Sequence, residues 1–361
     1  MPTAPAGPDL EFGLFDWVDA APGRDPADVY DARLDLLAEA DRGGFAVYHL
    51  AEHHGTPLGM APSPAVFLAA AARVTRRIRL APTTFVVPLY DPLRLAEEIA
   101  MLDQLSRGRL EVGVGKGSSP IEAAMYGVEP PEAARRFDAE VAAVLGALET
   151  GVFRRPGGGA DVALHLTAHQ RPHPPLWYPT TNPASVPGLG ERGYNVLFGF
   201  GFVTPPPEVV REQRDAFTAR FHEARAGGGA GHWGDRAAPR FGTMRHVLVA
   251  PTDEEAVALA RPAFADHYAS FAHLWRAHGD ARFATTPDVE DLAARGQFLL
   301  GSPRTVADRI AALAAATGVD YLACAFAWGS LAPADSLRSL RLFRDEVAPA
   351  VRAATGAAAR S

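Results

Sequence analysis

The chain has 361 residues, of which 48% are hydrophobic and 21% charged, enough to build a large buried core. Its formal net charge is −7 and no stripe of Lys and Arg stands out, which argues against binding to nucleic acid. No apolar run approaches the roughly 18 residues that span a bilayer, and the first residues lack the pattern of a signal peptide. The single cysteine, Cys324, excludes an intrachain disulfide and suits a reducing compartment. We therefore expect a soluble cytoplasmic protein.

Apolar stretches typical of buried strands alternate with helical patterns along the chain. Helix starts are marked by Ser63-Pro64, by Asp91-Pro92 and by the capping box that begins at Thr252. Parallel strands covered on both faces have no polar side, so nearly continuous apolar runs are expected for them. Eight such strands are expected, at residues 10–18, 45–50, 78–88, 109–117, 176–181, 195–202, 240–250 and 320–326. This alternation predicts a TIM (β/α)8 barrel, in a single domain that covers residues 1–361.

Two segments interrupt the alternation of strands and helices. They span about residues 151–175 and 278–297 and are expected as insertions after strands 4 and 7 of the barrel. The second segment has few aliphatic residues, which is the composition of a mobile lid over the carboxyl ends of the strands. A solvated insertion without a role has the same composition, so both interpretations stay open.

A cluster of ionisable side chains, Glu52-His53-His54, follows the second strand. The carboxyl ends of barrel strands are where ligands bind and chemistry occurs. Adjacent strand residues point to opposite faces, so the two histidines do not readily share a metal ion, and no further ligand pair completes a metal site. His53 would share the inner face with His49 and stand at the rim of the cavity. We favour His53 as a general acid/base over a structural hydrogen-bonded histidine pair, because the pKa of histidine lies near working pH.

Glycines occupy alternate positions on two strands. Gly113, Gly115 and Gly117 alternate along the fourth strand, and Gly199 and Gly201 along the sixth. Glycine within a strand often marks the close approach of a ligand. The pattern favours a barrel whose upper interior is open for a flat or bulky molecule, although glycines that ease local strand packing would look the same.

Two features near strand ends suit a phosphate group. Lys116 ends the fourth strand and supplies a point charge. The segment 180–185 after the fifth strand is rich in hydroxyls and amides and leads into a helix, whose free N–H groups favour anions. Each signal is weak by itself, because Thr-Asn-Pro is also an ordinary helix cap.

Four pieces of sequence occur in a fixed order along the chain. They are LAEHH at 50–54, APTTFVVP at 81–88 with Asp91-Pro92, LDQLSRGR at 102–109 running into GVGKG at 113–117, and a carboxyl-terminal piece from Gly301-Ser302-Pro303 to Phe343. This ordered set resembles the bacterial-luciferase-like flavin-dependent monooxygenases. The agreement covers most of the chain, is dense from about 45 to 127 and is poor in the two insertions.

The resemblance implies a barrel that binds FMN and usually forms a homodimer. It assigns His53 to the handling of the reduced flavin and its oxygen adduct. It places Thr83-Thr84 where luciferases carry a non-proline cis peptide against the flavin ring. It implies that the phosphate of FMN is bound by Lys116, Thr181, Asn182 and Ser185.

This sequence departs from the luciferase pattern at three positions near the flavin. Gly115 stands where luciferases carry a cysteine, Thr181 replaces an acidic residue, and Lys116 replaces an arginine whose bidentate contacts a lysine cannot imitate. These departures argue against light emission from a long-chain aldehyde. They also mean that the sequence supports a flavin-type cofactor more strongly than it supports FMN in particular.

The leading hypothesis is an FMN-dependent monooxygenase that oxygenates a small organic substrate through a peroxyflavin. A separate flavin reductase is expected because the barrel uses the whole chain and leaves no nicotinamide-binding domain. The phenylalanines of the sixth strand and Trp328 indicate an apolar substrate pocket. The alternatives are a hydride-transfer oxidoreductase that uses a deazaflavin on the same barrel, a flavin-binding protein without catalysis, and a metal-dependent hydrolase.

Overall fold

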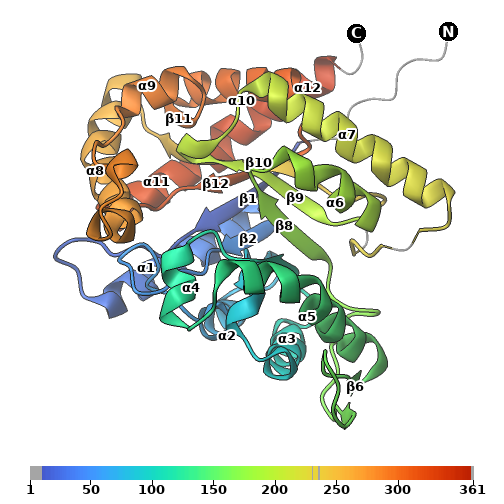
Figure 1. Ribbon diagram of the computed structural model, residues 1–361. Helices are drawn as coiled ribbons and strands as arrows, with labels where there is room; N and C mark the ends of the chain where they lie inside the picture. Colours follow the sequence, from blue (N-terminus) through green and yellow to red (C-terminus); the bar gives the residue numbers. More distant parts are fainter. Residues whose placement is uncertain (1–9, 230, 235, 359–361) are drawn as a thin grey trace, which may run out of the picture.

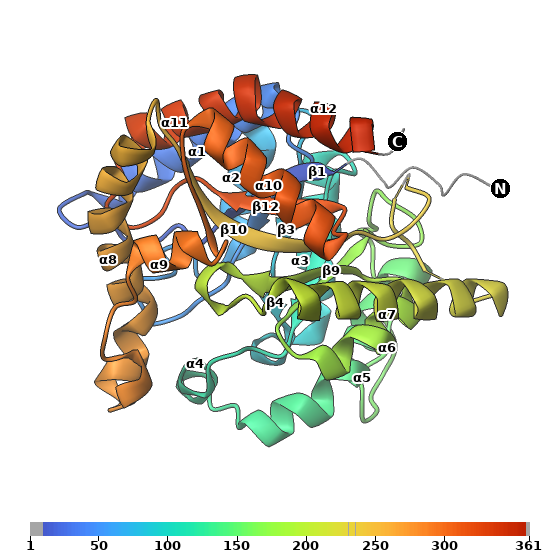
Figure 2. The ribbon, with the colours of Figure 1, turned by 90° about the horizontal axis from the view of Figure 1, so that it is seen from above.

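The computed structural model describes residues 10–229, 231–234 and 236–358 (Figure 1). Parallel strands form a barrel in the middle of the molecule, and helices surround it (Figures 1 and 2). The TIM barrel expected from the sequence is thereby confirmed, and each expected strand is present. The barrel strands are β1 (Glu11–Asp16), β2 (Val47–Leu50), β3 (Arg79–Pro82), β5 (Val112–Gly115), β8 (Leu176–Thr180), β9 (Asn195–Phe200), β10 (Phe241–Val249) and β12 (Tyr321–Ala325).

The barrel closes between its third and fourth strands. Hydrogen bonding connects the strands in the order β3-β2-β1-β12-β10-β9-β8-β5. The ends of this series meet at a parallel bridge between Leu80 and Leu110. There the backbone N–H of Leu80 donates to Arg109 at 2.9 Å, and that of Glu111 donates to Leu80 at 2.9 Å. The carboxyl ends of β2, β3, β5 and β8 therefore lie side by side at one mouth of the barrel.

Two short strands extend the barrel sheet. β4 (Phe85–Val86) pairs with β5, and β11 (Phe298–Gly301) pairs with the second half of β10. β3 ends at Pro82, which has no N–H to donate, and the Thr83–Thr84 peptide bond that follows is cis. Beyond this point the chain changes its hydrogen-bonding partner from β2 to β5.

Most helices begin with the signals that the sequence carries. Asp91 caps α3 by accepting the N–H of Leu93 at 2.9 Å, and Thr252 caps α8 by accepting that of Glu255 at 3.2 Å, whereas Ser63 makes no side-chain cap bond.

No helix in the described ranges is both long and apolar enough to cross a membrane. The main helices are α1 (Pro26–Gly43), α2 (Pro64–Val74), α3 (Pro92–Ser106), α5 (Pro130–Thr150), α6 (Val186–Arg192), α7 (Pro207–Ala226), α8 (Asp253–Ala277), α10 (Pro303–Thr317), α11 (Pro333–Leu342) and α12 (Ala348–Ala358).

Shorter helical segments lie in the connections. α4 (Pro120–Met125) follows β5 and α9 (Val289–Ala294) precedes β11. The remaining turns are the 3-10 helices η1 (Val87–Leu89), η2 (Pro183–Ser185), η3 (Gly201–Val203) and η4 (Ala281–Phe283), and the π-helical segment η5 (Phe343–Val347).

The buried apolar side chains form two layers. The outer layer lies between strands and helices and includes Leu14, Tyr48 and Leu322. Alternate residues of the same strands form a second cluster, which we call the inner cluster. Its members include Phe15, Trp17, Val47, Ala51, Ala81, Trp177, Leu197, Met244, Tyr321 and Ala323, with Phe200 and Phe202 packed against them.

The two insertions lie in different surroundings. Residues 151–175 join the end of α5 to the start of β8, and include an antiparallel hairpin of β6 (Val152–Phe153) and β7 (Val162–Ala163). In Figure 1 this hairpin projects at the lower right, away from α4 and α8. Residues 278–297 contain η4 and α9, and Val289 and Leu292 are buried against the inner cluster. The second insertion is thus partly helical and packed, and its role as a lid stays a prediction.

Candidate active site

The Glu52-His53-His54 segment directly follows β2 and forms a hydrogen-bonded support at the mouth of the barrel. The buried Glu52 carboxylate accepts the N–H of Val86 at 3.1 Å and the hydroxyl of Tyr90 at 2.9 Å. It also lies 2.8 Å from Nε2 of His54. His54 Nδ1 is in turn 2.8 Å from the hydroxyl of Tyr126. Glu52 and His54 therefore fix the segment after β2 to β4 and to Tyr126.

His53 is oriented by a carboxylate that comes from another element. Nδ1 of His53 lies 3.1 Å from Oε1 of Glu122 on α4, and Oε2 of the same carboxylate accepts the backbone N–H of His54 at 2.8 Å. A carboxylate beside Nδ1 favours the tautomer with its proton on Nδ1 and a lone pair on Nε2. Within the described part of the chain Nε2 makes no hydrogen bond, and the side chain remains 20% exposed. His53 can therefore accept a proton at Nε2.

The Glu122 carboxylate carries its charge at neutral pH. Burial raises the pKa of Glu122. The hydrogen bond and charge of His53 and the backbone N–H of His54 lower it by more than burial raises it, so the pKa lies below its usual range. The sequence interpretation missed Glu122. A signal was available, because Ser119-Pro120 begins a helix in which Ser119 Oγ accepts the N–H of Glu122 at 3.2 Å.

The Thr83-Thr84 dipeptide lies next to a buried histidine. The cis peptide expected there is present. Thr83 Oγ1 lies 2.8 Å from Nδ1 of His49, whose Nε2 lies 2.9 Å from the hydroxyl of Tyr321. His49 is fully buried at the inner face of β2, and its ring edge contacts Trp177 with centroids 4.7 Å apart. His49 thus fixes the position of the Thr83 hydroxyl.

The strand glycines make room for the protein's own atoms. A Cβ on Gly113 would lie 2.3 Å from the carbonyl oxygen of Pro82, and one on Gly115 would lie 2.7 Å from Oγ1 of Thr84. Gly199 and Gly201 have positive φ, and a Cβ there would meet Thr204 and His246 respectively. At these positions the local-packing interpretation is correct, and the expectation that the glycines leave space for a ligand is wrong.

The residues expected to bind phosphate lie at the ends of neighbouring strands. β5 pairs with β8, so Lys116 and the turn at residues 181–185 follow adjacent strands. Lys116 is exposed, with Nζ 5.3 Å from the ring centroid of Phe137, and it forms no ion pair with the described carboxylates. The exposed Thr181 precedes Asn182, whose Oδ1 accepts the N–H of Ala184 at 3.1 Å, while Ser185 Oγ donates to the carbonyl of Asn182 at 2.8 Å. The turn is thus already closed by internal bonds, and Lys116 keeps an unpaired charge.

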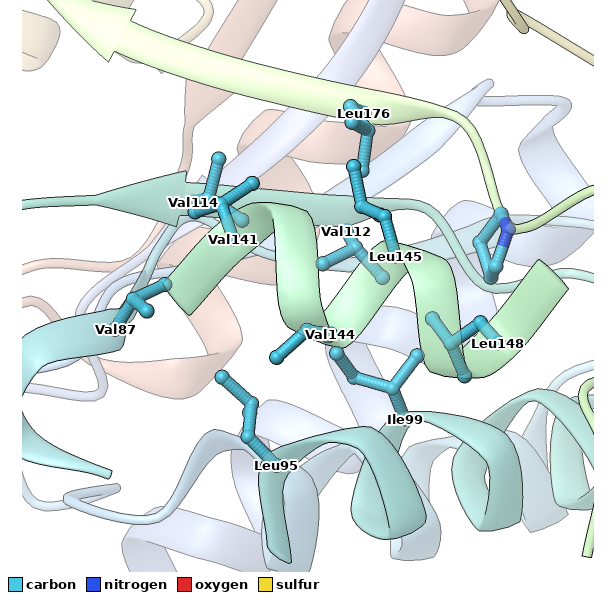
Figure 3. Close-up of a pocket in the computed structure, with 11 residues that line it drawn as sticks. Val87, Leu95, Ile99, Val112, Val114, Val141, Val144, Leu145, Leu148 and Leu176 are labelled. Carbon is cyan, nitrogen blue, oxygen red and sulfur yellow. The ribbon is translucent and has the colours of Figure 1, made fainter. Parts of the chain in front are cut away.

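An apolar gap between α3, α5 and β5 carries no site chemistry. Its volume is about 10 Å³, close to the minimum for one water molecule, and aliphatic side chains such as Leu95, Ile99 and Val144 line it (Figure 3). It is a packing gap in the outer layer. Among the described residues, no group of three His, Cys, Asp or Glu side chains is placed to hold a metal ion.

The barrel carries the His53–Glu122 pair and the Thr83–Thr84 cis peptide after the neighbouring strands β2 and β3, and comparison with known proteins identifies the family. Residues 10–321 match the family model of luciferase-like monooxygenases. The chain belongs to this family, and its homologues include flavin-dependent monooxygenases. It is therefore an oxidoreductase of the monooxygenase type, as the sequence motifs indicated.

Individual relatives match over most of their length. The uncharacterized protein y4wF of Sinorhizobium fredii is 35% identical over 94% of this chain and 96% of its own. The oxygenase component of the flavin-dependent trigonelline monooxygenase of Acinetobacter baylyi is 27% identical over 79% of this chain and 80% of its own. A solved structure with the same fold is the oxygenating constituent of 3,6-diketocamphane monooxygenase from Pseudomonas putida, in complex with FMN. It has a TM-score of 0.76, 24% identity, and coverage of 95% of this chain and 98% of that one.

Proposed function

We propose that this protein is the oxygenase component of a two-component, FMN-dependent monooxygenase that oxygenates a small organic substrate. The observation that carries the proposal is the His53–Glu122 pair, which leaves Nε2 of His53 without a partner among the described residues. The Thr83-Thr84 segment follows β3, the strand next to β2, at the same mouth of the barrel. Bound in its reduced form, FMN would supply the electrons that activate molecular oxygen. We also propose that one oxygen atom is then transferred to the organic substrate.

His53 would hold and move a proton at Nε2. Glu122 fixes the tautomer through Nδ1 and stabilises a positive charge on the ring when Nε2 takes up a proton. Glu52 and His54 would keep the backbone of His53 in place, because their bonds reach β4 and α4. A base of this kind suits a reaction in which a proton must be withheld from, or delivered to, the reacting oxygen.

The residues available for FMN fit its two ends. Thr83 and Thr84 would line the flavin ring, with the Thr83 hydroxyl fixed by His49. The unpaired charge of Lys116 fits the phosphate, together with Thr181, Asn182 and Ser185 at the end of the adjacent strand. Because Asn182 and Ser185 already bond within their own turn, Lys116 is expected to contribute most of the attraction for phosphate.

A separate reductase would deliver the reduced flavin. The names of two characterised relatives support this part of the proposal, since one is an oxygenase component and the other an oxygenating constituent. A cytoplasmic location would suit a reduced cofactor. It is consistent with Cys324, which is free and buried.

A homodimer is also part of the proposal. Four large apolar side chains are exposed on α2 and α3, which pack side by side: Val66, Val74, Met101 and Leu105. An apolar face of this kind is typical of an interface between subunits. Light scattering of the purified protein would give twice the mass of one chain, and Met101→Glu would shift it to the single-chain mass.

Titration of the purified protein with oxidised and reduced FMN tests the main proposal. We expect reduced FMN to bind, and formation of an oxygenated product to require reduced FMN, molecular oxygen and an organic substrate together. A deazaflavin, added in its oxidised and in its reduced form, serves as the matched cofactor control. Failure to bind either form of FMN would contradict the proposal, and reduction of added deazaflavin without oxygen uptake would favour hydride transfer. Binding without any turnover, over a panel of substrates, would favour the flavin-binding protein without catalysis.

A further inference from the structure

A second histidine pair lies in the barrel and has no part in the function proposed above. Nδ1 of His267, on α8, lies 2.8 Å from Oδ2 of Asp19. Nε2 of His267 lies 3.2 Å from Nε2 of His246, on β10. Asp19, His267 and His246 are each completely buried. The three side chains therefore form a continuous polar chain, which we call the relay, through an otherwise apolar region.

The relay ends in a polar atom without a partner. Nδ1 of His246 makes no hydrogen bond with any described residue, although it is buried. The ring stacks between Trp17, with centroids 5.2 Å apart, and Phe298, with centroids 4.4 Å apart. Its orientation is set by the contact of Nε2 with His267, so Nδ1 faces Gly201, where an added Cβ would lie 2.6 Å away. A buried ring nitrogen without a hydrogen bond destabilises the fold, which makes it a candidate for ligand contact.

The loop that carries Asp19 is held in an unfavourable backbone conformation. Val18 has a φ of 51°, which is rare for a β-branched residue. Its N–H donates to the Asp16 carboxylate at 2.7 Å, and its carbonyl accepts the N–H of Met60 at 3.0 Å. Such strain persists only where the surroundings impose it, and it occurs often at functional sites. It places Trp17 beside His246 and Asp19 beside His267.

Asp19 sets the protonation of the whole relay. Burial raises the pKa of Asp19. The hydrogen bond and charge of His267, the charge of Arg33 and the N–H of Gly329 lower it by more than burial raises it. The pKa of Asp19 therefore lies below its usual range. A charged Asp19 accepts the proton of His267 Nδ1, which leaves Nε2 of His267 as an acceptor. Nε2 of His246 must then donate, and Nδ1 of His246 carries a lone pair. Burial and the neighbouring His267 also hold the pKa of His246 well below its usual range.

We propose that His246 is a second acid/base residue of the active site, which binds and deprotonates the hydroxyl group of an aromatic substrate. The O–H bond of the substrate breaks and its electron pair stays on the oxygen, while the proton forms a bond to Nδ1 of His246. The proton on Nε2 of His246 passes to Nε2 of His267. The positive charge thus rests on His267, 2.8 Å from the Asp19 carboxylate. His267 and Asp19 are positioning residues.

The surroundings of Nδ1 select the kind of substrate. Aromatic rings dominate the region. The ring of Phe202 lies 6.3 Å from that of His246, and Phe271 packs on Phe202 with centroids 4.9 Å apart. Phe200 packs on Phe15, the neighbour of Trp17, with centroids 5.8 Å apart. Among the described residues, the charged or titratable groups that face the relay are Arg33 and Asp16, behind Asp19. A flat apolar molecule with one hydroxyl group would match the aromatic walls and the single free acceptor.

A series of contacting rings connects the relay to the proposed flavin site. Trp17 contacts Phe15 with centroids 4.7 Å apart, Phe15 stacks on His49 at 6.3 Å, and His49 contacts Thr83. On the other side, the loop of His53 is bound to α8, because Thr56 Oγ1 donates to the carbonyl of Ser270 at 3.1 Å. A substrate held by His246 would thus lie in the same inner cluster as the cofactor, so the inference rests on the proposed function.

Phenol and toluene form a matched pair of probes, since only phenol carries the hydroxyl. With histidine labelled by ¹⁵N, the NMR signal of His246 Nδ1, assigned by its loss in His246→Phe, is expected to be that of an unprotonated nitrogen. Phenol should shift this signal and bind about tenfold more tightly than toluene, and His246→Phe should abolish the preference. Equal binding of the two probes, or an unchanged signal, would overturn the proposal.

Two further variants separate positioning from a structural role. Asp19→Asn keeps the shape but removes the charge, so the unprotonated Nδ1 signal of His246 should become an average of two tautomers. His165→Phe, which changes an exposed histidine of the 151–175 insertion, should leave the signal unchanged.

Titration with FMN is run on the same samples. FMN binding without a phenol preference would contradict only the role of His246, whereas a phenol preference without FMN binding would contradict the proposed function. An unchanged tautomer in a folded Asp19→Asn protein would contradict the relay.

Discussion

Nδ1 of His49 lies 2.8 Å from the hydroxyl oxygen of Thr83, and this contact joins the sealed interior of the barrel to the cis peptide at its mouth. The opposite ring nitrogen lies 2.9 Å from the Tyr321 hydroxyl on β12. His49 therefore reaches from β2 to two other parts of the barrel. The same contact makes the stability of the fold sensitive to the protonation of one imidazole.

The stability of the protein should fall in acid because of His49. Burial, which outweighs the charge of Glu111, lowers the pKa of His49 from 6.5 to about 3. Between these two values the unfolded chain binds a proton that the native state does not. The free energy of unfolding should therefore decrease as the pH falls from 6.5 towards 3, by about 1.4 kcal/mol per pH unit.

Urea unfolding of the wild type and of His49→Phe across this pH range measures the effect. The variant loses the partners of the Thr83 and Tyr321 hydroxyls, which lowers its stability by a constant amount of ~1–3 kcal/mol. The advantage of the wild type should therefore shrink as the pH falls and reverse before pH 3, because the wild type loses about 1.4 kcal/mol per pH unit and the variant does not. Parallel stability curves would contradict the assignment to His49.

Removal of the His53 imidazole should abolish turnover without loss of the cofactor. His53→Ala is expected to lower kcat by about 10²–10⁴-fold, the usual contribution of a general acid/base, while FMN binding changes little. Glu122→Gln should have a smaller effect, because the amide oxygen still accepts from Nδ1 but carries no charge. Stopped-flow kinetics with reduced FMN measures both variants, and His165→Ala is the control. Full activity in His53→Ala would refute the role of His53.

Phosphate recognition should depend on Lys116. Lys116→Met is expected to weaken FMN binding by about 10–100-fold, since a charge-assisted hydrogen bond contributes ~1.5–3 kcal/mol. Binding of riboflavin, which lacks the phosphate, should be unchanged. Calorimetric titration with both flavins gives the comparison, and Lys116→Arg serves as the conservative control. An equal loss for FMN and riboflavin would place Lys116 elsewhere than at the phosphate.

A side chain at position 115 should be incompatible with Thr84. Gly115→Cys introduces a Cβ 2.7 Å from Oγ1 of Thr84, so the variant should lose ~1–3 kcal/mol of stability through overpacking. Thr84→Gly removes the clashing atoms and should restore part of the loss in the double variant. Thermal unfolding of the two single variants and the double variant tests this coupling. Additive effects would show that the two side chains do not compete for one space.

The periodicity of the chain was sufficient to predict the barrel. Strands buried on both faces, such as β2 and β12, require continuous apolar runs, and cap pairs such as Asp91-Pro92 mark where the next helix begins. The strand alternation also placed His49 on the inner face correctly, since its ring contacts Trp177 and Tyr321 of the inner cluster. These are local rules, and they operate over a few neighbouring residues.

The partners of the site residues depended on the tertiary structure. Glu122 reaches His53 across 69 positions of sequence, and Asp19 reaches His267 across 248, so no spacing rule could have connected them. The glycines of β5 looked like space for a ligand, yet the Pro82–Thr84 segment fills that space. By itself the sequence determined the barrel and the position of His53 at the end of a strand, because both follow from alternation along the chain. Only the closure of the barrel decided which carboxylate orients each histidine, because that depends on which distant segments the closed sheet brings together.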